Sequence, residues 1–282
     1  APPFPEIDCT MPLFTRFAGP TLGGLLLCLF SLATHADLYR DSGMQRHQEH
    51  FQIALKQAQQ RYLGVLPESL RQPLEQRSRQ RFEPEGMHQR AQARLAVALD
   101  TQTEQKAHAF YTSELGRKIV GLETKATSST GIRALQQRTA RPAVPATRQA
   151  LLQRLGERLP VVELGVEAGV AIGSLAVQGA NDLLGGLLQI PTQSLDGQRQ
   201  RLRGELQANL PDSLAQVYAP LSDQELINYL GWAESEAGQQ FLSAVELAAR
   251  SAKVGIRPDT AGHGRVRHAQ AAHARLLIKS RF

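Results

Sequence analysis

The sequence predicts an all-α protein made of two similar helical units, produced by an internal duplication and fused as a helical bundle. Ala, Leu, Gln, Glu and Arg, all good helix formers, are abundant in a composition that is 42% hydrophobic but only 5% aromatic. Two stretches also match without a gap at an offset of 122 residues, with seventeen identities across the 88 aligned positions of 39–126, where ordinary residue frequencies give about six. A repeat of this kind fixes the architecture before any motif is considered.

Residues 1–36 are expected to be an upstream extension followed by a secretory signal peptide. A short positive start precedes the uncharged stretch 17–32, and Ala36 is a small residue in front of Asp37. We therefore expect cleavage near Ala36 and export to the periplasm of a Gram-negative envelope. The alternative is an uncleaved anchor, because the apolar stretch is about long enough to span a bilayer. Both cysteines, Cys9 and Cys28, precede the cleavage position, so we expect no disulfide and no cysteine metal site in the mature chain.

We name residues 37–126 the first repeat. Apolar spacing predicts helices over 41–62, 69–82 and 87–99, separated by Pro67 and by the Pro-Glu-Gly run that follows the second helix. A further helix start is predicted in each half by capping-box spacing, within one residue of matching positions. The residues concerned are Thr101 and Glu104, and Ser222 and Glu225.

Residues 127–149 are predicted to be a linker, because Ser, Gly and Pro are concentrated there. Residues 150–254, the second repeat, open with Gly165, Gly169 and Gly173 at intervals of four. On a helix these glycines form one smooth groove, which predicts close approach of a second helix. Glu167 and Asp182 argue against a membrane span, because only fourteen uncharged residues lie between them.

The positive charge of the chain is confined to its C-terminus. The net charge is +6, while the eight Lys or Arg and one Asp from 250 to 282 contribute +7, which leaves about −1 for everything before. Residues 255–282 therefore form a basic C-terminal tail. Because the expected export removes the chain from the cytoplasm, nucleic acid is disfavoured as a partner.

A short motif in the first repeat resembles a known family. F-Y-T-S-E-L-G-R-K at 110–118 is similar to the F-Y-x-S-x-x-G-Q-K signature of a family of uncharacterised, signal-bearing, all-helical envelope proteins of Gram-negative bacteria. The segment 221–241 resembles the same signature and its upstream cap, although G-W-A stands at 231–233 in place of Phe-Tyr and Gln240 replaces Lys118. The resemblance implies a helical fold and a periplasmic location. It implies no activity, since the family is a domain of unknown function.

The signature residues are expected to be structural. A Ser followed by Glu, with Gly three positions after the Ser, can cap a new helix and let a neighbour approach at the Gly. A catalytic serine is the alternative, but no His lies nearby in sequence to activate it. The predicted structural residues are Phe110, Ser113, Gly116, Trp232, Ser235 and Gly238.

No catalytic residue, metal site or cofactor is predicted. His47 and His50 would share a helix face and could hold a metal, but they lack the H-E-x-x-H arrangement, and we interpret them as surface histidines on a solvated helix.

The candidate ligand-binding residues are arginines that recur as Q-R-x-R-x-R-x-E in both repeats, at 76–83 and 198–205. On a helix they fan around most of the circumference, so one interpretation is a polar helix balanced by its own acids. The other is recognition of an anionic group by planar guanidinium forks. The six are Arg77, Arg79, Arg81, Arg199, Arg201 and Arg203.

The sequence thus favours a non-enzymatic periplasmic protein with a binding or scaffolding role toward an envelope partner or an anionic membrane surface. The alternative is an envelope hydrolase with its site between the two copies. A pocket where a His and a carboxylate converge would favour the hydrolase, whereas outward-pointing arginines would favour binding or simple solubility.

Overall fold

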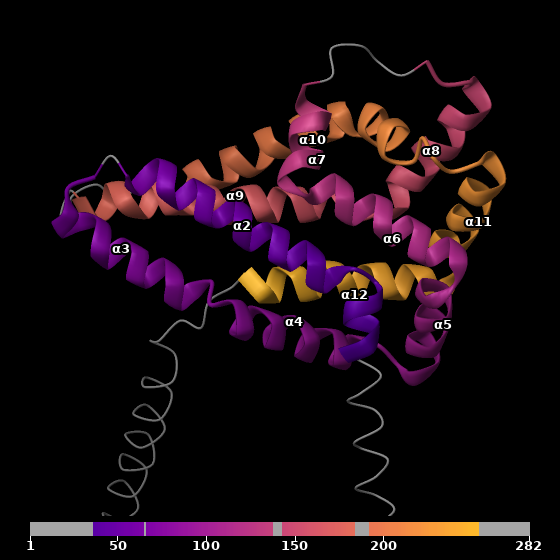
Figure 1. Cartoon of the computed structure of the whole chain (residues 1–282), viewed down its shortest axis with the longest axis horizontal. Helices are drawn as coiled ribbons and strands as arrows, with labels where there is room; N and C mark the ends of the chain where they lie inside the picture. The colour runs from indigo at the N-terminus through magenta and orange to yellow at the C-terminus, as the bar shows by residue number, and fades with distance from the viewer. Residues whose placement is uncertain (1–35, 65, 138–142, 184–191, 254–282) are drawn as a thin grey trace, which may run out of the picture. The chain divides into compact units, whose positions relative to one another are not determined.

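The computed structural model describes residues 36–64, 66–137, 143–183 and 192–253; the side chains of Leu70 and of 175–195 are not described. These residues belong to one unit of the chain, 35–282, and within them every regular element is a helix, which confirms the all-α prediction (Figure 1). The predicted signal peptide and the basic tail at 255–282 lie outside the described residues, apart from Ala36. The helices are α2 (Met44–Leu63), α3 (Glu68–Arg81), α4 (Pro84–Ala98), α5 (Thr101–Thr112), α6 (Glu114–Thr127), α7 (Ser129–Gln136), α8 (Ala146–Arg158), α9 (Val161–Leu183), α10 (Thr192–Val217), α11 (Asp223–Glu234) and α12 (Glu236–Lys253).

Proline sets the starts of α3 and α4. Pro67 is the residue before α3, as its position between two predicted helices indicates. α4 begins at Pro84, earlier than the expected start at Met87, because Pro is well suited to the first helical position and Glu83 caps it. The Glu83 side chain accepts the amide N–H of Glu85 at 3.0 Å.

Helix boundaries recur at the offset of 122 residues. α5 and α11 begin at 101 and 223 and end at 112 and 234, and α6 and α12 begin at 114 and 236. The N-cap of α5 is Asp100, one residue before the predicted Thr101, and it aligns with Ser222, the N-cap of α11. Ser222 and Glu225 form the predicted capping box, with both of its bonds present. The duplication itself stays a proposal, which these matched boundaries support.

The predicted linker is partly helical. α7 occupies 129–136 and α8 begins at Ala146, so only part of 127–149 lies outside helices among the described residues. α7 buries none of its residues, which explains why its composition resembles that of a loop.

The glycine groove of α9 receives α10, as the sequence predicts. A Cβ atom on Gly165 would lie 2.8 Å from Leu206 Cδ1, and one on Gly169 would lie 3.0 Å from Leu202 Cδ1. Gly173 similarly faces a residue four positions earlier on α10. Because successive glycines meet successively earlier residues, the two helices run antiparallel with their backbones close together.

The two repeats share one hydrophobic core. α4 of the first repeat packs along α12 of the second, where they lie side by side in Figure 1. Met87 and Leu95 of α4 and Phe241 of α12 are at most 1% exposed and belong to the same cluster. Each such side chain contributes about 1.5–3 kcal/mol by leaving water, so the core joins the repeats instead of separating them into independent domains.

Candidate functional site at the junction of the two repeats

A single serine forms the connection between α5 and α6. Ser113 has an extended backbone (φ −66°, ψ 165°), and its hydroxyl donates to the Phe110 carbonyl oxygen (2.6 Å) and accepts the amide N–H of Gly116 (3.0 Å). It therefore caps α6 and ties it to the last turn of α5. Ser235 makes the same two bonds between α11 and α12. Its hydroxyl donates to the Trp232 carbonyl oxygen (2.7 Å) and accepts the amide N–H of Gly238 (3.0 Å). Both hydroxyls are thus engaged in capping.

The glycines of the signature permit this tight corner. A Cβ atom on Gly116 would lie 2.1 Å from the Phe110 carbonyl oxygen, and one on Gly238 would lie 1.9 Å from that of Trp232. Among the described residues only Gly43 has a positive φ, so the signature glycines are required for the close approach of backbone and not for a left-handed conformation.

A third corner of the same design lies in the predicted linker. The Ser128 hydroxyl donates to the Lys125 carbonyl oxygen (2.7 Å) and accepts the amide N–H of Gly131 (3.1 Å). A Cβ atom on Gly131 would lie 2.1 Å from the same carbonyl oxygen. The S-x-x-G pattern of the two signature corners therefore occurs a third time, at 128–131.

Aromatic side chains fill the place where the two repeats meet. Phe110 and Trp232, which are 122 residues apart, stack with ring centroids 4.6 Å apart and an interplanar angle of 12°. Tyr111 meets Trp232 edge-on and lies 5.0 Å from Phe241, and Tyr229 stacks on Phe110 at 6.0 Å. Offset-stacked and edge-to-face pairs at such distances add about 0.5–1.5 kcal/mol each beyond their buried area.

Two polar contacts at the junction are reciprocal. Lys118 on α6 forms an ion pair with Glu225 on α11 (Nζ–Oε1 2.6 Å), and the Thr103 hydroxyl on α5 donates to Oε1 of Gln240 on α12 (2.6 Å). At the offset of 122 residues, Lys118 aligns with Gln240 and Thr103 aligns with Glu225. Each contact is therefore the counterpart of the other. Reciprocity of this kind is the property of an interface with two-fold symmetry. The change from Lys118 to Gln240 therefore preserves a contact between the repeats.

A partly buried carboxylate without an equivalent in the other repeat lies at the same junction. Glu123 of α6 accepts hydrogen bonds from the hydroxyls of Tyr218 (2.6 Å) and Tyr229 (2.8 Å). Burial raises the pKa of Glu123, while the bonds from the two phenols lower it, and the net shift is upward. This cluster cannot be predicted from the sequence, because a glutamate on an amphipathic helix resembles a solvated one and its partners lie 95 and 106 residues away.

The arginines of the second repeat are mostly engaged within the fold. Arg203 on α10 makes two hydrogen bonds to the carboxylate of Glu163 on α9 (3.0 and 2.8 Å), and Arg199 binds Glu167 at 2.7 Å. Arg250 of α12 lies 3.5 Å from Glu163. These pairs fasten α10 and α12 to α9.

The remaining four arginines lie on α3 and α10. Burial lowers the pKa of Arg81, whose guanidinium lies 4.9 Å above the ring of Phe82. Arg77, Arg79 and Arg201 are exposed. The repeated pattern therefore combines internal ion pairs with outward-pointing cations.

The two histidines of α2 meet the end of α6. Nδ1 of His47 and Nδ1 of His50 lie 2.9 and 3.0 Å from Oγ1 of Thr127. They are partly buried, in contrast to the solvated surface positions we expected. Burial and then the proximity of His50 lower the pKa of His47 to about 4. Among the described residues no group of three or more His, Cys, Asp or Glu is placed to hold a metal.

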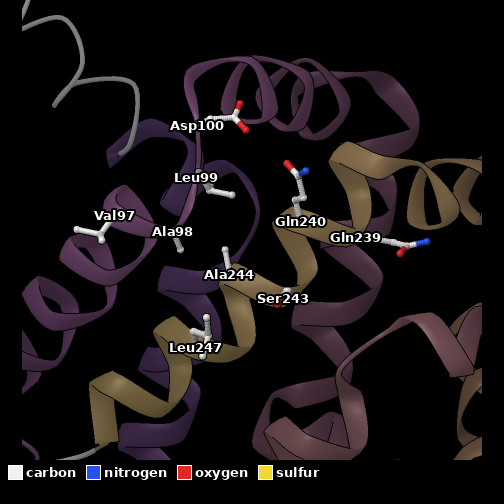
Figure 2. A pocket seen from close by; sticks show the side chains of 9 residues that line it. All are labelled: Val97, Ala98, Leu99, Asp100, Gln239, Gln240, Ser243, Ala244 and Leu247. Carbon is white, nitrogen blue, oxygen red and sulfur yellow. The ribbon is translucent and has the colours of Figure 1, made fainter.

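An open groove of about 660 Å³ lies where α4 ends beside α12. Val97 and Leu247 on its two sides are 79% and 38% exposed, and Figure 2 shows Asp100 near Gln240 at one end of it. The residues that line it are Val97, Ala98, Leu99, Asp100, Gln239, Gln240, Ser243, Ala244 and Leu247. This lining holds a single carboxylate and no histidine, cysteine or cation.

Comparison with known proteins gives no relative: no family model, no curated protein and no solved structure matches the chain. Within the described ranges, none of the helices combines the length and the apolar character that crossing a membrane requires.

Proposed function

We propose that this chain is a non-enzymatic helical protein of the Gram-negative envelope, exported by its signal peptide, with a binding or scaffolding role toward an envelope partner or an anionic surface. The observation that carries the proposal is the packed junction. A hydrolase with its site between the repeats would need a concave, accessible site there. Around α5 and α11 that space is filled by the Phe110–Trp232 stack and its aromatic neighbours. The open groove between α4 and α12 is lined by one carboxylate but by no histidine that could activate a water or a serine.

The signature serines support a scaffolding role in the same way. The hydroxyls of Ser113 and Ser235 each donate to a backbone carbonyl and accept a backbone amide. A nucleophilic serine needs its proton directed at a base, whereas these protons are directed at the preceding helix. The resemblance of the signature to envelope proteins supports the proposed location.

Exposed arginines support an anionic surface as the binding target. Arg79 and Arg201 occupy corresponding positions of the two repeats, are exposed, and have no ion-pair partner among the described residues. Arg199 and Arg203 carry the same charge but are paired with glutamates. Near a negative membrane surface each unpaired cation is worth about 1 kcal/mol, which corresponds to roughly fivefold in affinity.

The test is co-sedimentation of the mature protein with vesicles of phosphatidylglycerol and phosphatidylcholine. We expect the protein to bind these vesicles, and the binding should weaken as salt is raised. The affinity should fall about 25-fold in an Arg79→Gln, Arg201→Gln variant. Binding should be lost when the tail from Gly255 is deleted. Arg199→Gln, Arg203→Gln is the matched control, since it removes the same net charge from paired positions and should reduce binding less.

Absence of vesicle binding at low salt would refute the anionic-surface role. Affinity capture of the mature protein from envelope extract would then separate the remaining possibilities, because a specific protein supports scaffolding and a specific small molecule supports the hydrolase.

A further inference from the structure

The carboxylate of Glu123 joins the two repeats through one oxygen atom. Oε1 accepts the hydroxyl of Tyr218, which follows α10, and the hydroxyl of Tyr229 on α11. The two tyrosines are 2% and 1% exposed, and Glu123 is partly buried against them. Positions 96, 107 and 245, which align with these three residues at the offset of 122, are Ala, Ala and Val. The cluster is therefore specific to one side of the junction.

Within the part of the chain that the structure describes, no cation forms an ion pair with Glu123. Burial and the bonds from Tyr218 and Tyr229 are the causes that shift its pKa, and Tyr111 of α5 is the other titratable group that interacts with it. The charged and titratable side chains of α6 and of neighbouring helices have other partners. Lys118 binds Glu225, and Arg133 of α7 binds the Ser129 carbonyl. Arg148 of α8 binds Asp223 and the carbonyls of Tyr218 and Leu221. His47 and His50 of α2 bind Thr127. A carboxylate held against two buried phenols without a cation is costly to keep ionised.

We propose that Glu123 is a proton-controlled latch: uptake of a proton by its carboxylate stabilises the contact between α6 and α11, so that the two repeats hold together more firmly in acid. A neutral carboxyl group keeps a carbonyl oxygen that can accept from the phenols. Protonation therefore removes the charge without removing the acceptor.

The direction of the pH dependence follows from linkage. The folded-state pKa of Glu123 is raised above its unfolded value, so the folded chain binds this proton more tightly than the unfolded chain does. The stabilisation is complete below the unfolded pKa of about 4.3 and is lost as pH rises through the folded value.

A matched pair of variants tests the proposal on the same two helices. Glu123→Gln keeps the acceptor and removes titration, and we measure its melting temperature against wild type from pH 8 to pH 3. The melting temperature of wild type should rise relative to that of Glu123→Gln as pH falls. Glu225→Gln should show the opposite trend, because the bonds from Lys118 and then from the Ser222 backbone lower the pKa of Glu225. The latch is overturned if the difference in melting temperature between wild type and Glu123→Gln stays constant with pH. It is also overturned if this difference changes with pH in the same direction as the one for Glu225→Gln.

A second measurement covers the case in which Glu123→Gln fails to fold. The carboxyl NMR signal of Glu123 should titrate above the usual range for glutamate in wild type, and higher still in Tyr229→Phe, because that variant removes a donor to the charged form. A Glu123 signal that titrates at or below the usual range, or one that Tyr229→Phe leaves in place or lowers, refutes the proposal.

Discussion

Replacing Gly116 by alanine should open the corner between α5 and α6. The new Cβ atom would lie 2.1 Å from the Phe110 carbonyl oxygen, and ordinary contact begins near 3.4 Å, so the backbone must separate by about 1.3 Å. Overpacking of this kind costs about 1–3 kcal/mol, and the lost bond from Ser113 to the same carbonyl costs about 1 kcal/mol more. The stack of Phe110 on Trp232 would also loosen.

The helix preference of alanine offsets only about 1 kcal/mol of this cost, so we expect Gly116→Ala to lose about 1–3 kcal/mol of unfolding free energy. Gly121→Ala is the control on the same helix, since a Cβ atom there meets nothing within 4 Å. It should gain about 0.5–1 kcal/mol. Urea unfolding followed by circular dichroism measures both, and equal midpoints for the two variants would show that the reasoning about the corner is wrong.

Three further predictions concern other contacts. Gly165→Ala should destabilise the fold by about 1 kcal/mol, less than a clash with backbone, because the Leu206 methyl group 2.8 Å away can rotate; urea unfolding measures it. Arg203→Met should lower the urea midpoint by removing the two hydrogen bonds to its glutamate on α9, whereas Arg201→Met, which loses an unpaired exposed arginine, should leave the midpoint unchanged. Burial lowers the pKa of Lys253 to about 8, so wild type should gain stability relative to Lys253→Met as pH rises from 8 toward 10.5; thermal melts across this range check the sign.

The helices and their caps could be predicted from local signals. Apolar spacing, Pro67 and the Ser222–Glu225 capping box indicate helix positions through interactions within a few residues. The first cap was assigned to Thr101 instead of Asp100, because both residue types cap helices and only the folded backbone decides between adjacent positions. The glycine groove was predictable for the same local reason, since its spacing matches one face of a helix.

The functional site could be predicted only in part. The signature identified Phe110 and Trp232 as anchors, but nothing in the sequence indicates that they stack on each other. Glu123 was missed because its character depends on Tyr218 and Tyr229, which approach only after folding. The pairing of Arg203 was likewise invisible, because Glu163 belongs to a different helix.

The reciprocal contacts carry an evolutionary consequence under the proposed duplication. In a symmetric homodimer each substitution appears twice, so Lys118 could not change without its twin. Once both copies lie in one polypeptide, either half of a mirrored pair can drift alone, provided that its own partner adapts. Such freedom accounts for a charged pair on one side and the neutral Thr103–Gln240 pair on the other. It also allows a new feature to arise in one copy only. Symmetry would otherwise impose such a feature, for example the carboxylate of Glu123, on both copies.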